Sequence, residues 1–137
     1  MCSLLLALTL LAAPVNLIPN ADFAADPAGW NLPRQFSLDT TVGHGDQRSL
    51  KFVQPDAAAY PMATYPFKLV PGRLYHFSAW VKTQGVTGEE SGATICLEYD
   101  GPKGWLGGAW PTGGKGDRNW FQVSGAVTLP EEAIASH

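Results

Sequence analysis

Glycine and proline interrupt this sequence so often that they limit its fold more than any other feature. The chain has 15 glycines and 11 prolines among 137 residues, and both residue types are unfavourable inside helices. No segment keeps its apolar residues at the 3.6-residue spacing of a long amphipathic helix. Short strands joined by turns suit such a chain best. We therefore expect one all-β domain.

Alternation of apolar and polar side chains indicates where the strands lie. Residues 74–83, 93–100 and 120–129 each place apolar side chains on one face and mostly polar ones on the other. In the first segment the polar face carries one large aromatic residue, Trp80. Weaker strands are predicted at 35–41, 49–54 and 63–70. This spacing favours a β-sandwich of two antiparallel sheets, such as a jelly roll.

The segment 101–118 differs from the rest of the chain. Half of its residues are glycine or proline, yet it also contains Trp105, Leu106 and Trp110. We expect a long loop, interrupted by a short strand at 105–110. Aromatic side chains on a glycine-rich loop favour a binding role, because glycine lets the backbone follow the shape of a ligand.

The chain begins with an apolar run at residues 4–13 that only Thr9 interrupts. About ten residues are too few to span a bilayer, but they match the apolar centre of a secretory signal. We therefore expect residues 1–15 to be an export signal without its basic start, and no membrane span. The folded domain is then 16–137, in a secreted or extracytoplasmic protein. A core strand or helix is the alternative interpretation of this run.

Composition excludes several classes of function. The formal net charge is −3 and the nine basic residues are scattered, whereas a nucleic-acid surface needs clustered positive charge. After loss of the signal, one thiol remains, Cys96, which is too few for an internal disulfide or a metal cluster. Glu98 and Asp100 share a strand face, but such neighbours are ordinarily solvated, and no catalytic motif is present. We expect no enzymatic activity.

Tryptophan is the residue type that indicates a function. The chain has five tryptophans; we assign Trp30 and Trp120 to packing, and the other three to a binding face. An indole offers a flat apolar surface that can stack on the C–H face of a sugar ring. Nearby polar side chains can then bind the hydroxyls. The predicted ligand-binding residues are His76, Trp80, Glu98, Trp105, Trp110 and Gln122, with Trp80, Glu98 and Gln122 facing one groove.

Several short motifs, taken in order, resemble a known family. They are Asn16–Phe23 with Gly29 and Trp30, then 45–52 (GDQRSLKF), 71–82 (PGRLYHFSAWVK), Asn119 with Trp120, and 127–130 (VTLP). Together they resemble carbohydrate-binding modules of the family 4/9/22 type, over about residues 16–130. The resemblance implies a galactose-binding-like jelly roll, of the kind attached to secreted glycoside hydrolases.

Two departures from that family bear on cofactors and on the length of the domain. Members usually have an acidic residue, which helps to hold a structural calcium, where this chain has Ala24. The resemblance therefore leaves calcium doubtful, and no cofactor is required. Members also end in a strand of the Phe-Asp-Asp type that is missing here, so we expect a C-terminally truncated fragment of a longer protein.

The expected function is that of a non-catalytic module that binds a polysaccharide or oligosaccharide. Its further partner would be a catalytic domain in the same longer chain, and the family resemblance implies a glycoside hydrolase for that domain. The alternative is a structural or protein-interaction sandwich that orients such a domain without binding sugar. A jelly-roll lyase or hydrolase is a third interpretation, and it would need clustered catalytic side chains in a groove.

Overall fold

The computed structural model describes residues 15–45, 48–54, 61–88 and 91–137, and it contains strands but no helix over these ranges. The expected signal lies almost wholly outside the described residues. The strands are β1 (Phe36–Asp39), β2 (Ser49–Phe52), β3 (Leu74–Val86), β4 (Leu97–Gly101), β5 (Gly104–Ala109), β6 (Gly116–Thr128) and β7 (Ala135–Ser136). The prediction of an all-β chain is confirmed.

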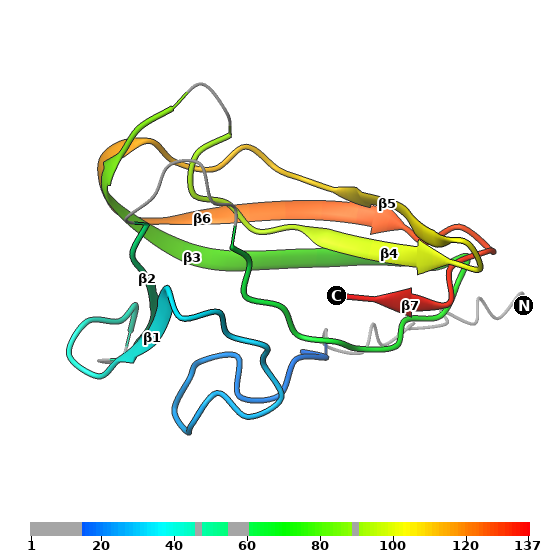
Figure 1. The fold of residues 1–137 in the computed structure, drawn as a ribbon, viewed down its shortest axis with the longest axis horizontal. Helices are drawn as coiled ribbons and strands as arrows, with labels where there is room; N and C mark the ends of the chain where they lie inside the picture. The colour runs from blue at the N-terminus through cyan, green and yellow to red at the C-terminus, as the bar shows by residue number, and fades with distance from the viewer. Residues whose placement is uncertain (1–14, 46–47, 55–60, 89–90) are drawn as a thin grey trace, which may run out of the picture.

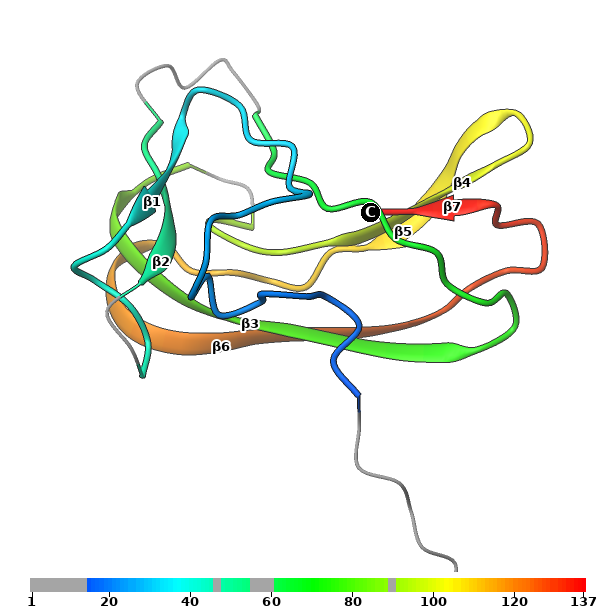
Figure 2. The ribbon, with the colours of Figure 1, turned by 90° about the horizontal axis from the view of Figure 1, so that it is seen from below.

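The strands form antiparallel sheets in two layers (Figures 1 and 2). One layer consists of the long strands β3 and β6, and the other has the order β5-β4-β7. The hairpin of β1 and β2 lies at one end of the molecule. This arrangement is consistent with the expected β-sandwich.

The core lies between the two layers. Leu97 of β4 is buried there with Leu129 and Ala133, and Tyr75 and Phe77 of β3 pack against them. Along β3 the more buried side chains alternate with exposed ones, as the sequence pattern predicts. The inner face of β3 is therefore the apolar face, and Trp80 is on the outer face.

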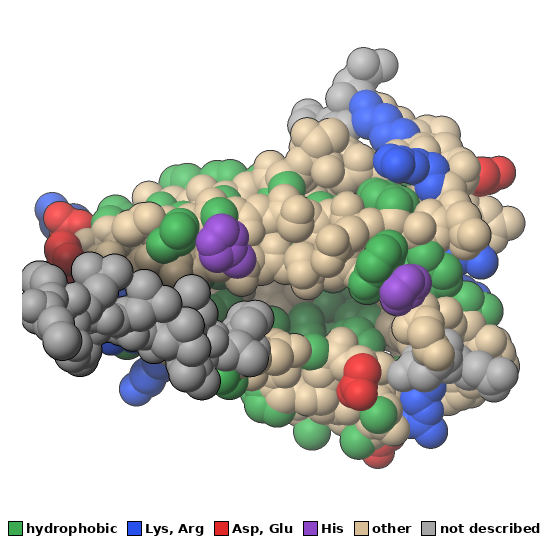
Figure 3. Space-filling model, turned by 180° about the vertical axis from the view of Figure 1, so that it is seen from behind, with side chains coloured by type: hydrophobic (Ala, Val, Ile, Leu, Met, Phe, Trp, Pro, Cys, Tyr) green, Lys and Arg blue, Asp and Glu red, His purple; other side chains and the backbone are tan. Residues whose placement is uncertain are grey.

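This core is thin. Among the described residues only four hydrophobic side chains are buried: Leu97, Val123, Leu129 and Ala133. The space-filling view from behind shows a hollow with hydrophobic side chains on its floor (Figure 3). The layers are therefore in contact, but they do not enclose a large apolar interior.

The predicted strand at 63–70 is wrong. This segment forms only isolated bridges, between Thr64 and Asn31 and between Phe67 and Ser136. Pro66 lies between the two bridged positions and has no N–H to donate, which explains why a continuous ladder does not form. The predicted strand at 93–100 is shorter than expected, because regular pairing begins only at Leu97.

The glycine-rich segment is more regular than the sequence suggested. The predicted short strand exists as β5, which pairs with β4 across a two-residue turn at Pro102 and Lys103. The end of the segment, from Gly116, already belongs to β6. Only residues 110–115 between the two strands remain as a loop.

Candidate functional site

Three of the predicted binding residues meet on the outer face of the β3–β6 layer. Trp80 lies directly opposite Gln122 in the ladder, and His76 lies opposite Ala126. Antiparallel partners have their side chains on the same face of the sheet. All four of these residues are exposed, so this face presents a row of accessible side chains over several strand positions.

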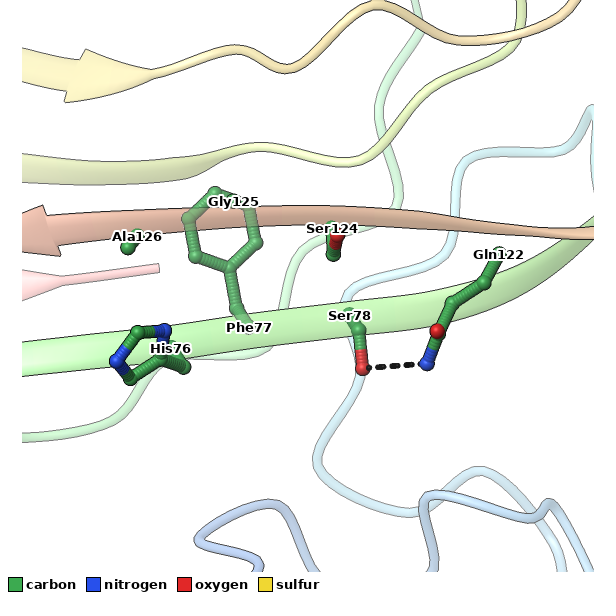
Figure 4. A pocket seen from close by; sticks show the side chains of 7 residues that line it. All are labelled: His76, Phe77, Ser78, Gln122, Ser124, Gly125 and Ala126. Atoms are coloured by element: carbon green, nitrogen blue, oxygen red, sulfur yellow. Dashed lines mark hydrogen bonds between the residues drawn. The ribbon is translucent and has the colours of Figure 1, made fainter.

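A pocket of about 430 Å³ lies on this layer. Figure 4 shows the side chains of His76, Ser78 and Gln122 on one side of the sheet and the Phe77 ring on the other side. The Nε2 of Gln122 donates to Ser78 Oγ at 3.4 Å. With Ser124 also in its lining, the pocket offers hydroxyl, carboxamide and imidazole groups that can donate and accept hydrogen bonds.

An aromatic cluster adjoins the pocket. The ring of His44 stacks on Trp80, with centroids 3.8 Å apart and planes 11° from parallel, and it meets Trp120 edge-on at 5.8 Å. Trp80 is still 47% exposed, so part of its indole remains accessible. Sequence reasoning missed His44, because it lies in a Gly-His-Gly turn with no periodicity to place it.

The other three predicted residues form a second cluster on the β4–β5 hairpin. The indole Nε1 of Trp110 donates to Glu98 Oε1 at 2.8 Å. The rings of Trp105 and Trp110 lie 6.1 Å apart at an angle of 36°. The second oxygen of Glu98 is 3.5 Å from Nε2 of His137. The sequence analysis did not assign His137 to any site.

The two clusters lie on opposite outer faces of the sandwich. Leu97 and Tyr99 of β4 point into the core, so Glu98 between them points outward from its own layer, away from β3 and β6. The prediction that Trp80, Glu98 and Gln122 face one groove is therefore right for Trp80 and Gln122 and wrong for Glu98. Alternation assigns a face within a strand, but it does not say which sheet the strand joins.

Cys96 is not suited to nucleophilic chemistry. Burial raises the pKa of its thiol, and the negative charge of Glu98 raises it further. The thiol therefore stays protonated at neutral pH, and the protonated form is a poor nucleophile.

The residues around Ala24 do not fit a structural calcium ion. Ala24 offers no carboxylate, and its carbonyl accepts a hydrogen bond from Arg48 Nη1 at 2.8 Å. The side-chain oxygen of Asn20 already accepts from the Ala25 N–H at 2.9 Å. Over the described ranges, no group of three or more His, Cys, Asp or Glu side chains is placed to bind a metal ion.

Comparison with models of known families, with curated proteins and with solved structures finds no match for this chain. In the described part of the chain, no helix has the length and hydropathy needed to cross a bilayer. The functional argument therefore depends on the geometry of the two surface clusters.

Proposed function

We propose that this protein is a non-catalytic carbohydrate-binding module whose outer β3–β6 face holds a sugar chain. The observation that carries the proposal is the position of Trp80 beside a polar pocket. Its indole lies across the ladder from Gln122, and Gln122 reaches Ser78. An apolar ring next to amide and hydroxyl groups complements a sugar, which has an apolar C–H face edged with hydroxyls.

The residues that line the pocket favour a neutral glycan. The residues that line the pocket include no Asp, Glu, Lys or Arg, so affinity comes from stacking and neutral hydrogen bonds. Large aromatic side chains dominate the energetics of interfaces because of the area that they bury. The Trp80 indole is therefore the main source of affinity, and Gln122, Ser78 and His76 provide selectivity.

The proposal extends to the protein that carries this domain. The resemblance of its motifs to carbohydrate-binding modules supports a galactose-binding-like jelly roll as the type of sandwich. The same resemblance, with the apolar run at 4–13, supports export and attachment to a glycan-active catalytic domain.

Affinity electrophoresis tests the proposal. Wild-type protein is run through native gels that contain xylan, β-glucan, mannan or galactan. We expect retardation on at least one glycan, and a loss of affinity of at least tenfold in Trp80→Ala. Thr128→Ala is the matched control, because Thr128 is exposed on the same strand pair but does not line the pocket.

The outcomes separate the proposal from its alternative. Retardation that Trp80→Ala abolishes and Thr128→Ala preserves supports sugar binding at this face. If no gel retards the wild-type protein, the proposal is wrong, and a structural or protein-interaction role becomes the better interpretation.

A further inference from the structure

We infer that the β4–β5 hairpin carries a second sugar-binding platform, made by Trp105 and Trp110 and positioned by Glu98. This inference rests on the proposed function only for the class of ligand, since its residues are separate from those of the first site. The two platforms face away from each other, so one molecule would join two glycan chains.

The glycine opposite Glu98 leaves room for the edge of the Trp110 ring next to the strand. Gly108 is the cross-strand partner of Glu98, and a Cβ atom at Gly108 would lie 2.9 Å from Cζ2 of Trp110. The ring therefore rests on the backbone where any other residue would have a side chain. A side chain at position 108 would therefore displace the Trp110 ring.

A hydrogen bond fixes the orientation of this ring. The Glu98 carboxylate accepts from the Trp110 indole N–H at 2.8 Å, and hydrogen bonds to charged groups are stronger than neutral ones. The Glu98 side chain is itself only 14% exposed. Glu98 is thus a positioning residue, which holds the indole in place before the ligand arrives and so lowers the entropy lost on binding.

A β-bulge brings Trp105 to the same face. The register shifts between Tyr99 and Asp100, so that Trp105 pairs with Asp100 and Leu106 has no partner in the ladder. Residues 105 and 110 are an odd number of positions apart, so strict alternation with Leu106 paired in the ladder would place Trp105 and Trp110 on opposite faces. Bulges commonly redirect side chains at functional sites.

Both indoles are accessible to solvent. Trp105 is 63% exposed and Trp110 is 47% exposed. Two adjacent exposed indoles are unusual, since tryptophan is ordinarily highly buried. The ring planes of Trp105 and Trp110 are 36° apart, so sugar rings of a bent glycan chain can stack on both indoles.

Charge narrows the ligand class. Glu98 and Asp100 share the outer face of β4 with the two indoles, and a carboxylate accepts hydrogen bonds but repels like charge. The platform should therefore bind neutral sugars and reject glycans rich in uronic acids. The oligosaccharide that this site binds is neutral, like the ligand proposed for the first face.

The test measures how many sugar chains one molecule binds. Hexasaccharides of xylan, β-glucan, mannan and galactan are titrated by calorimetry into wild type, Trp80→Ala and the double variant Trp105→Ala/Trp110→Ala. We expect two sites on the wild type and one on each variant. Polygalacturonate, as the acidic probe, should show no binding at the second site.

A second readout reports bridging. Wild-type protein should raise the turbidity of a soluble neutral polysaccharide, because it crosslinks chains, whereas either variant should bind without crosslinking. Circular dichroism establishes that the variants are folded. Unchanged stoichiometry and turbidity in the Trp105→Ala/Trp110→Ala variant would overturn the second platform and leave the first site intact.

The remaining outcomes separate the two sites. If that double variant abolishes all binding while Trp80→Ala has no effect, the platform is supported and the proposed β3–β6 site is wrong. If the wild-type protein binds none of the hexasaccharides, both proposals fail.

The positioning role of Glu98 has its own test. Glu98→Ala should weaken binding at the second site several-fold and move the Nε1–H resonance of Trp110, while Glu98→Gln, whose amide oxygen still accepts, should retain both. A merely structural role would leave the binding constant of the folded Glu98→Ala variant unchanged, and that result would refute the assignment.

Discussion

A single methyl group added at Gly125 should disturb the packing between β3 and the core. Gly125 lies opposite Phe77 in the ladder, and a Cβ atom there would come within 2.5 Å of Cζ and 2.9 Å of Cε1 of the Phe77 ring. These distances are too short for carbon atoms, so the ring must move. Phe77 also packs against the cluster that contains Leu97 and Leu129, which limits where it can go.

The size of the effect follows from two opposing contributions. Overpacking of this kind destabilises by about 1–3 kcal/mol. Replacing a strand glycine by alanine recovers roughly 0.5–1 kcal/mol of backbone entropy. We therefore expect Gly125→Ala to lower the free energy of unfolding by about 1–2 kcal/mol. With a urea m-value of about 1–3 kcal/mol/M, the midpoint should fall by roughly 0.5–1 M.

Urea denaturation of four proteins measures this effect: wild type, Gly125→Ala, Phe77→Ala and the double variant. Removing the Phe77 ring removes the clash, so the added methyl should cost nothing in the Phe77→Ala background. An equal loss of stability in both backgrounds, or none in the wild-type background, would refute the reasoning.

Three further predictions concern the core and the turns. Leu97 is 4% exposed, so Leu97→Ala should lower the free energy of unfolding by about 2–5 kcal/mol in the same denaturation assay. Leu74 is 59% exposed, so the control variant Leu74→Ala should change the free energy of unfolding by less than about 0.5 kcal/mol. Within the described part of the chain, the buried Thr83 Oγ1 has no hydrogen-bond partner. Thr83→Val should therefore raise the unfolding temperature in calorimetry by an amount equivalent to about 1 kcal/mol, and a lower temperature would contradict this. Hydrogen bonds from the Thr41 backbone N–H, and then from its hydroxyl, lower the pKa of Asp39. The stability contributed by the ionised carboxylate should therefore be present at neutral pH and disappear as the pH falls through that lowered pKa. NMR titration of the Asp39 carboxyl should show the low pKa, and an ordinary value near 3.9 would contradict the prediction.

The sequence predicted the face of a strand on which a side chain lies better than it predicted which strands are neighbours in a sheet. In β3, the alternation assigned Phe77 to the core and Trp80 to the outside, and the structure agrees. This works because side-chain direction in a strand is a local property of the backbone. The sheet that Glu98 joins depends instead on contacts between distant segments, and no local pattern encodes them.

Proline and glycine were the second source of error in the strand predictions. The apolar character of 63–70 predicted a strand, but Pro66 within it leaves only two isolated bridges. At β5 the error was the opposite one, because abundant glycine predicted mostly loop where the structure has a strand. Gly107 and Gly108 leave room for the rings of Tyr99 and Trp110, which lie where a side chain at these positions would be. Glycine composition alone does not distinguish a flexible loop from a close contact between a ring and a backbone.

The bulge in the β4–β5 hairpin has a consequence for how this surface can change by insertion and deletion. The turn fixes Gly101 opposite Gly104, and the far end of the hairpin fixes Tyr99 opposite Gly107. Deleting Leu106 would leave Trp105 opposite Asp100 in a regular ladder, with both indoles still on one side. A single-residue insertion or deletion between Gly107 and Trp110 would turn one indole toward the core. Chain length is therefore constrained between Gly107 and Trp110, whereas Leu106 is the position where a deletion is tolerated.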